Sequence, residues 1–357
     1  MWILDFGMKN CIQNINFIEV VRPLKTTFST SLGKKDVVKS VIVKVTLKDG
    51  AYGFGEIPTS FALKHETIHA IKNILKEVSP RFLNVPIDEY EHKFSVLRKK
   101  YALYPMTISG FEVSLFRAYL RSRDISEHAY WGGKTTRLET DITIPFTLDG
   151  TALERWMKYV LKKGFTIYKL KVSGDVEKDR RFISSVYGML KNNLDKFVIR
   201  LDGNQGYKEK TFLEMTNHIA KAGYNIQLFE QPLPKRDYRG LKEIKTYSPI
   251  PIILDETIFT VYDLQRAVEE NLCDGVNIKI AKSGISESVK ILTLAKKYKL
   301  KLMIGCMTET MTGLSAGIYL ASGTGSFDFI DLDSIYFLHH KNQYEAIDIK
   351  DHEFIIH

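Results

Sequence analysis

From about residue 139 to residue 333, short apolar runs alternate with amphipathic segments, and this alternation constrains the fold more than any other feature. Segments with helical periodicity separate runs that are rich in β-branched and aromatic residues. The runs are TDITIPF, TIYKLKV, FVIRLD, IQLFEQP, PIILDE, GVNIKI, LKLMIG and FDFIDLD. Eight strands alternating with seven helices predict an α/β fold, a TIM-like (β/α)7β barrel. An open doubly wound sheet is the alternative, although no Gly-x-Gly-x-x-Gly follows an early strand.

The first 125 residues have a different pattern. The segments FIEVVRPL and SVIVKVTLKDGAYGFGE are β-rich, and Asp49-Gly50 lies between two apolar stretches, which is typical of a hairpin turn. Three segments with helical periodicity follow, near residues 66–78, 86–100 and 106–122. An α+β region therefore precedes the barrel.

Charge and cysteine content limit the partners that we expect. The net charge is +9, but acidic residues are mixed among the basic ones, so the charge indicates a solvated surface. We therefore expect no nucleic-acid partner, and RNA binding stays open as an alternative. There is no run of 18 apolar residues and no signal-peptide pattern at the start, so we expect a cytoplasmic protein without a membrane partner. Three widely spaced cysteines fit a reducing compartment, and the sequence leaves a homo-oligomer open.

Carboxylates follow three successive strands of the predicted barrel. Asp202, Glu230 and Asp255 end the third, fourth and fifth apolar runs. Catalytic groups of such barrels come from the carboxyl ends of different strands. Hard oxygen ligands from neighbouring strands suit Mg²⁺, and the lack of His or Cys at these places disfavours zinc. Taken singly, each acid is more simply explained as the N-cap of the following helix.

Lysines flank these acids along the chain. Lys169 and Lys171 share one face of the second strand because they are two residues apart, and Lys279 ends the sixth strand. The second and sixth strands lie on opposite sides of a closed barrel, so Lys171 and Lys279 would flank a substrate. A lysine with a tuned pKa can serve as a general base. A solvent-facing edge strand is the alternative for the lysine pair, but it does not explain charges at matching places on four strands.

The motifs KLK, LDGNQG, FEQP, DET and NIKIAKSG resemble those of the enolase superfamily, in its muconate-lactonising branch. The later DLD makes the chain most similar to the dipeptide epimerases, typified by L-Ala-D/L-Glu epimerases. The resemblance covers nearly the whole chain. It implies a capping domain over residues 1–125, completed by residues 334–357, and a barrel catalytic domain over residues 126–333.

The resemblance also implies the chemistry. Asp202, Glu230 and Asp255 would bind Mg²⁺, and Lys171 and Lys279 would be the two acid/bases. Lys169 would assist at the substrate carboxylate. The reaction would be a 1,1-proton transfer at the C-terminal residue of an L,L-dipeptide such as L-Ala-L-Glu, through an enediolate, and would serve the recycling of cell-wall peptides.

Substrate contacts are also expected from the resemblance. Asp331 and Asp333 match the Asp-x-Asp that binds the substrate's α-ammonium group. The loops 26–36 and 56–67 would cover the substrate. Gly33 stands where glutamate-specific members often have Arg, so either Lys34, or Lys35 beside it, would bind a side-chain carboxylate, or the enzyme would prefer another side chain. A solvated loop is the alternative for both lysines. The remaining candidates for substrate contacts are Phe61, Met307 and Glu309.

Two other functions stay open at this point. An N-acylamino acid racemase, an o-succinylbenzoate synthase or a muconate cycloisomerase would keep the metal and the lysines without needing Asp331 and Asp333. A basic binding protein on a barrel scaffold would need no metal affinity.

Overall fold

Eight parallel strands form the barrel that the sequence predicts, in a computed structural model that describes residues 10–339, 344 and 346–357. The sheet order is β12-β11-β10-β9-β8-β7-β6-β5. The strands are β5 (Ile142–Ile144), β6 (Ile167–Lys171), β7 (Val198–Asp202), β8 (Ile226–Glu230), β9 (Ile252–Leu254), β10 (Gly275–Ile278), β11 (Lys301–Gly305) and β12 (Phe329–Asp331). The Asp141 N–H donates to the Ile330 carbonyl at 3.2 Å, which joins the two ends of the sheet. The predicted fold class is confirmed.

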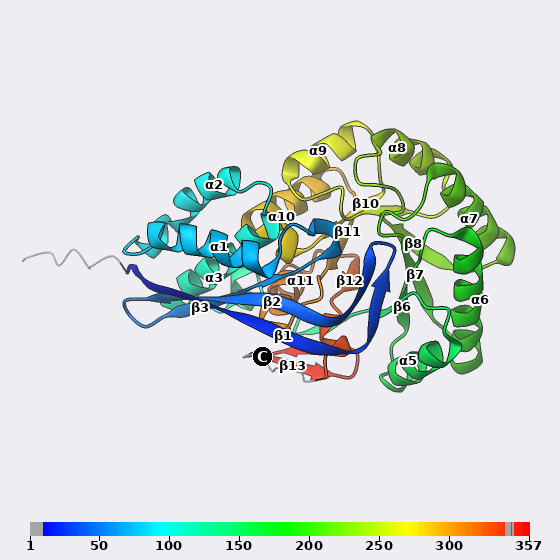
Figure 1. Ribbon diagram of the computed structural model, residues 1–357, viewed down its shortest axis with the longest axis horizontal. Helices are drawn as coiled ribbons and strands as arrows, with labels where there is room; N and C mark the ends of the chain where they lie inside the picture. The colour runs from blue at the N-terminus through cyan, green and yellow to red at the C-terminus, as the bar shows by residue number, and fades with distance from the viewer. Residues whose placement is uncertain (1–9, 340–343, 345) are drawn as a thin grey trace, which may run out of the picture.

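A helix follows each barrel strand except the last (Figure 1). The helices are α5 (Gly150–Lys162), α6 (Val176–Asn193), α7 (Glu209–Ala222), α8 (Tyr238–Tyr247), α9 (Val261–Glu269), α10 (Ile280–Lys297) and α11 (Met311–Thr324). Each presents an apolar stripe to the sheet, such as Leu153, Trp156 and Val160 on α5, because residues three and four apart share a helix face. The parallel strands are therefore covered on their outer face and read as short apolar runs.

The N-terminal region is a separate antiparallel sheet with helices packed on it. Its strands are β1 (Ile12–Thr30), β2 (Gly33–Leu47) and β3 (Tyr52–Pro58), and the hairpin predicted at Asp49-Gly50 joins the last two. Its helices are α1 (Ile68–Val78), α2 (Tyr90–Lys100) and α3 (Pro105–Ser122), close to the predicted ranges. Gly53 and Gly55 let β3 approach α3, since a Cβ on Gly55 would lie 1.9 Å from the Gly110 carbonyl oxygen.

The far end of the β1–β2 hairpin reaches over the barrel (Figure 1). The Ser31 hydroxyl at its tip lies 2.7 Å from the Asn204 carbonyl oxygen and 3.0 Å from the Gly203 carbonyl oxygen, in the loop after β7. A register shift between Pro23 and Phe28 interrupts the pairing of the two strands, and such irregularities bend a ribbon. The hairpin therefore covers the carboxyl ends of the barrel strands.

The C-terminal segment forms a third sheet. Strands β13 (Ile347–Lys350) and β14 (Glu353–Ile356) pair with β4 (Arg137–Glu139), which follows the short helix α4 (Glu127–Tyr130). Before this sheet, Phe337 stacks on Trp156 of α5 at 4.6 Å and meets Phe28 of β1 edge-on at 5.3 Å. The division into residues 1–125 with 334–357 and residues 126–333 stays a prediction.

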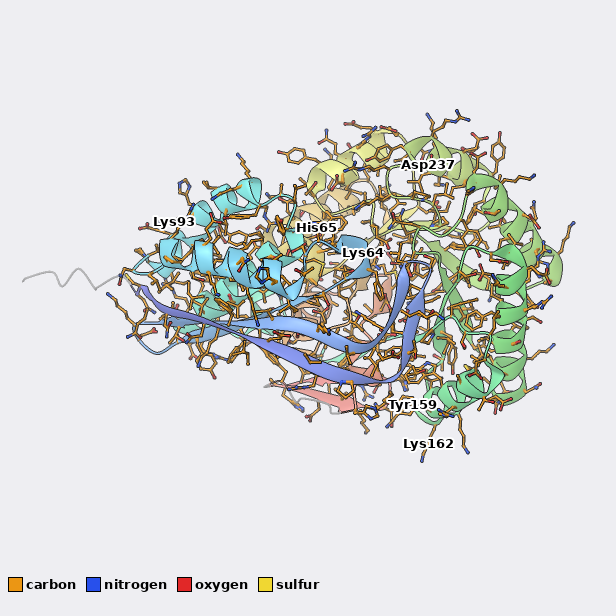
Figure 2. All side chains as sticks on the ribbon, viewed as in Figure 1. Lys64, His65, Lys93, Tyr159, Lys162 and Asp237 are labelled. Carbon is orange, nitrogen blue, oxygen red and sulfur yellow. The ribbon has the colours of Figure 1, made fainter. Side chains whose placement is uncertain are left out.

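The outer surface carries many of the basic side chains. Lys93 on α2 and Lys162 on α5 are exposed and extend outward from the protein (Figure 2). No helix in the described part of the chain is both long and apolar enough to cross a membrane.

Candidate active site

The charged residues predicted at the strand ends come together at one end of the barrel. Strand register places Lys171 beside Asp202 and Asp202 beside Glu230, and Asp255 follows the end of β9 directly. All three carboxylates are buried, and Lys169 is completely buried. None of the three is a helix cap, because the N-cap residues of α7, α8 and α9 are Lys208, Asp237 and Thr260. The helix-cap explanation of these acids is therefore wrong.

Lysines contact each of the three carboxylates. Lys171 Nζ lies 2.5 Å from Asp202 Oδ2, and Lys279 Nζ lies 2.7 Å from Asp255 Oδ2. Lys169 pairs with Glu230 and lies 3.3 Å from Asp202 Oδ2. A fourth lysine that the predicted set lacked, Lys282, lies 2.6 Å from Asp255 Oδ1. Its place one helical turn after Lys279 on α10 is the signal that could have revealed it.

These contacts separate the pKa values of the acids. Burial alone would raise the pKa of Asp202, but Lys171 and Lys169 outweigh it and lower the pKa to about 2. Burial and the neighbouring Asp202 charge raise the pKa of Glu230 to about 7. Burial lowers the pKa of Lys279, yet Asp255 and Glu230 more than offset this, and the pKa rises. Ion pairing, rather than exposure to water, therefore balances the charge of the site.

The backbone around these acids is unusual. Asn204, Gln205 and Gln231 have φ values of +40°, +68° and +32°, a region that non-glycine residues rarely occupy. Hydrogen bonds hold these turns, since the N–H of Gly203 donates to the Glu230 carbonyl at 2.9 Å and that of Gln205 donates to the Gln231 carbonyl at 2.8 Å. Such locally strained turns cluster at functional sites.

The donor set fits a hard divalent cation. The three carboxylates offer only oxygen atoms, and Asn204 Oδ1 and Glu256 Oε2 beside them are buried without a hydrogen-bond partner among the described residues. Buried polar oxygens without partners are rare and commonly mark an ion or a water. Asp202, Glu230 and Asp255 could therefore hold Mg²⁺.

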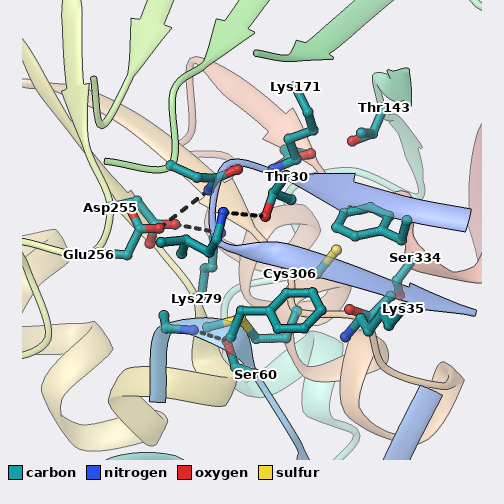
Figure 3. A pocket seen from close by; sticks show the side chains of 18 of the residues that line it. Thr30, Lys35, Ser60, Thr143, Lys171, Asp255, Glu256, Lys279, Cys306 and Ser334 are labelled. Atoms are coloured by element: carbon teal, nitrogen blue, oxygen red, sulfur yellow. Dashed lines mark hydrogen bonds and ion pairs between the residues drawn. The ribbon is translucent and has the colours of Figure 1, made fainter. Parts of the chain in front are cut away.

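A cavity opens at this place and is lined by the barrel and by the N-terminal loops (Figure 3). Lys171 and Lys279 both line it, and they come from β6 and from the end of β10, four places apart in the eight-stranded order. Gly305 leaves room for the second lysine, because a Cβ there would lie 2.8 Å from Lys279 Cε. The two amines therefore reach the cavity from opposite sides of the barrel.

Asp331, which ends β12, and Asp333 just after it form the next wall of the cavity. Asp331 and Asp333 both line it, and Lys169 Nζ lies 2.6 Å from Asp331 Oδ2. The backbone N–H of Thr143 donates to Asp333 Oδ2 at 2.6 Å. Burial and the Asp331 charge raise the pKa of Asp333 to about 6. Oxygens of Asp331, Asp333 and Asp141 lie within 4.8 Å of one another, and Asp141 was absent from the predicted site.

The loop residues divide between two cavities. Lys35, Phe61 and Met307 line the cavity with the lysines, whereas Lys34 is exposed and lines a separate cavity beside α5. Neighbouring residues of a strand point to opposite faces, so only one of the two lysines can face the barrel. The structure thus places Lys35, rather than Lys34, at the site, and Figure 3 shows it on the cavity wall with Cys306.

Two of these residues are ionisable groups with shifted pKa values, the half-buried Lys35 and the buried Glu309. Burial lowers the pKa of Lys35 to about 8, and its Nζ lies 5.6 Å from the Phe61 ring centre. Glu309 does not line the cavity, and its Oε1 accepts a hydrogen bond from the Met307 N–H at 3.1 Å. Burial and the nearby Glu56 raise the pKa of Glu309 to about 8. Glu309 therefore supports the wall that carries Met307 rather than facing the cavity.

Comparison with known proteins identifies relatives with this architecture. Residues 152–356 match the family described as Enolase C-terminal domain-like. The L-Ala-D/L-Glu epimerase of Thermotoga maritima is 30% identical over 317 residues, which cover 88% of this chain and 89% of that protein. The substrate-liganded L-Ala-D/L-Glu epimerase of Bacillus subtilis superposes with a TM-score of 0.89 at 26% identity, covering 97% of this chain and 96% of that one.

A third similar structure has lower sequence identity and supports only the similarity of the fold. The dipeptide epimerase of Enterococcus faecalis, solved with Mg and the dipeptide L-Leu-L-Tyr, superposes with a TM-score of 0.88 at 24% identity. It covers 97% of each chain.

Proposed function

The chain belongs to the enolase C-terminal domain-like family, and we propose that it is a Mg²⁺-dependent dipeptide epimerase. It would invert the Cα of the C-terminal residue of an L,L-dipeptide. One observation carries the proposal: two buried lysines, Lys171 and Lys279, reach one cavity from strands on opposite sides of the barrel, with carboxylates between them.

Opposed amines suit a 1,1-proton transfer. One lysine, as the neutral amine, takes the α-proton from one face of the substrate carbon. The electron pair left behind delocalises into the adjacent carboxylate to form an enediolate. The other lysine, as the ammonium, returns a proton to the opposite face and inverts the centre. The two lysines exchange roles in the reverse direction.

The enediolate carries more negative charge than the substrate, so fixed positive charge should stabilise it. Asp202, Glu230 and Asp255 would hold Mg²⁺, which when bound supplies Lewis-acid stabilisation of the substrate carboxylate. Lys169 is buried among these acids and provides a positive charge that needs no reorganisation during the reaction. Because three carboxylates surround it, its pKa is raised even though burial acts to lower it, and it stays charged.

The acids at the end of β12 and just after it favour a dipeptide over an N-acylamino acid. Asp331 and Asp333 line the cavity and would bind the free α-ammonium group. An acylated amine offers no positive charge, so racemases of acylamino acids and the lactonising enzymes gain nothing from this pair.

Lys35 supports a finer proposal about the side chain. It lines the cavity, is half-buried and makes no ion pair among the described residues. A cation held in this way favours an anionic partner, so we infer that the preferred C-terminal residue is acidic, as in L-Ala-L-Glu. Cys11, Cys273 and Cys306 form no disulfide with one another, which supports a cytoplasmic site of action and fits a role in the recycling of cell-wall peptides.

Proton NMR in D₂O with Mg²⁺ tests the proposal directly. The protein is mixed with L-Ala-L-Glu and with L,L-dipeptides that have neutral, apolar or cationic C-terminal side chains. We expect the α-proton signal of the C-terminal residue to disappear while the L,D diastereomer grows. Absence of exchange on every dipeptide, with the metal bound, would refute the proposal.

A further inference from the structure

Asp141 is a buried acid that the proposed reaction does not use. It directly precedes β5 and is fully buried. Its Oδ2 accepts a hydrogen bond from Arg200 Nη1 at 2.7 Å, whereas its Oδ1 has no hydrogen-bond partner in the described part of the chain. A buried carboxylate oxygen without a partner is costly, so its place in the fold calls for an explanation.

The surroundings of Asp141 are rich in negative charge. Oxygens of Asp141, Asp331 and Asp333 lie within 4.8 Å of one another, and among the described residues two cations, Arg200 and Lys169, form ion pairs with this group. Lys169 is also shared with Asp202 and with Glu230. Burial and Asp331 raise the pKa of Asp141, and the Arg200 guanidinium 2.7 Å from its Oδ2 opposes this rise and favours the ionised form. With the three acids ionised, these two cations leave one negative charge uncompensated. This negative charge lies behind the cavity wall that Asp331 and Asp333 form.

Asp141 itself does not line the cavity, so it would act through the two acids that do. Its partner Arg200 also donates to Gln227 Oε1 at 2.7 Å and to the Ile330 carbonyl at 3.1 Å, so neutral contacts would keep Arg200 in place. Without the Asp141 charge, Arg200 would present an unopposed positive charge beside β12. That charge would repel a cation bound at Asp331 and Asp333.

We propose that Asp141 is a positioning residue that keeps the Asp331 and Asp333 site selective for the ammonium group of the substrate. This inference rests on the proposed function. Asp141 holds Arg200 and gives the group its net negative charge, while the Asp141 N–H ties the start of β5 to the Ile330 carbonyl. The ligand of the group is an organic ammonium ion, since Lys169 and Arg200 already occupy one side of it.

The test compares two substrates that differ only in the ammonium group. L-Ala-L-Glu carries it, and propionyl-L-glutamate has the same chain length without it. The rate of α-proton exchange in D₂O is measured for the wild type, Asp141→Asn and Asp141→Glu. Asp149→Asn is the matched control, because Asp149 is exposed and only caps the start of α5.

We expect Asp141→Asn to lower kcat/KM for L-Ala-L-Glu by about tenfold, mainly through KM, and to change exchange of propionyl-L-glutamate by less than about twofold. Asp141→Glu keeps the charge and should keep the preference for the ammonium group. This variant also provides the test if Asp141→Asn does not fold.

An equal loss on both substrates would assign Asp141 a purely structural role. Loss of a second bound Mn²⁺ in Asp141→Asn would assign the group to a metal. Either result, or a folded Asp141→Glu without the preference, overturns the inference. A wild type that exchanges no dipeptide would instead refute the proposed function itself, and the inference with it.

Discussion

Replacement of Lys35 by methionine tests how the cavity selects the substrate side chain. Methionine keeps most of the length and apolar volume of lysine, so the change removes the charge with little loss of packing. Burial lowers the pKa of Lys35 from 10.5 to about 8, so holding its charge there costs roughly 3 kcal/mol. An anionic side chain beside Lys35 recovers part of that free energy, and a neutral one does not.

We take the recovered part as about 2 kcal/mol, because the site is only half-buried and water screens the pair. Lys35→Met should then lower kcat/KM for L-Ala-L-Glu by about 30-fold. The value for L-Ala-L-Gln should stay within about threefold, because the amide has the same shape without the charge. The rates come from growth of the L,D diastereomer by proton NMR.

Lys34→Met provides the matched control, because Lys34 is exposed, neighbours Lys35 in β2 and lines a different cavity. It should leave both substrates unchanged. The reasoning fails if Lys35→Met lowers the two substrates equally, or if Lys34→Met gives the same loss on L-Ala-L-Glu.

Four further outcomes follow from the same contacts. Above pH 8, kcat/KM for L-Ala-L-Glu should fall relative to L-Ala-L-Gln, because Lys35 loses its proton there and the attraction exists only below that pKa; parallel profiles for the two substrates would contradict this. Lys171→Met and Lys279→Met should each abolish epimerisation but retain α-proton exchange of one diastereomer, a different one in each variant, whereas a single-base mechanism would leave the same diastereomer active in both. Glu230→Gln should weaken Mn²⁺ binding measured by calorimetry by about tenfold or more, and unchanged binding would exclude Glu230 as a ligand. Arg117→Met should destabilise the fold by about 3–5 kcal/mol in chemical denaturation, because Arg117 pairs with Glu127 at 2.7 Å in a buried site, and a loss below about 1 kcal/mol would refute this.

Strand and helix periodicity made the barrel predictable. A parallel strand covered on both faces needs a short apolar run, and the connection to the next parallel strand needs a helix, so both requirements appear locally in the sequence. The carboxyl ends of parallel strands lie at the same edge of the sheet. Asp202, Glu230 and Lys279 could therefore be placed together before any tertiary contact was known.

The residues that line the substrate cavity were less predictable, because their orientation depends on how distant segments pack. Lys34 and Lys35 are adjacent residues of the same type, so the sequence cannot distinguish them. Only the bend and register of the β1–β2 hairpin decide which one faces the barrel. Glu309 follows a barrel strand like the other acids, yet its carboxylate accepts a hydrogen bond from the Met307 N–H and does not line the cavity. Sequence pattern specifies an alternation of faces, but it does not say which face meets the cavity.

The sequence by itself determined the barrel, the order of its strands and the charged residues at their carboxyl ends, because each follows from local periodicity. Only the tertiary structure decided that Asp141 lies against Asp331 and Asp333, 190 and 192 residues later in the chain, and that the C-terminal hairpin pairs with β4. These contacts form where the two ends of the rolled sheet meet. No local pattern encodes that meeting, since it depends on the twist and closure summed over all eight strands.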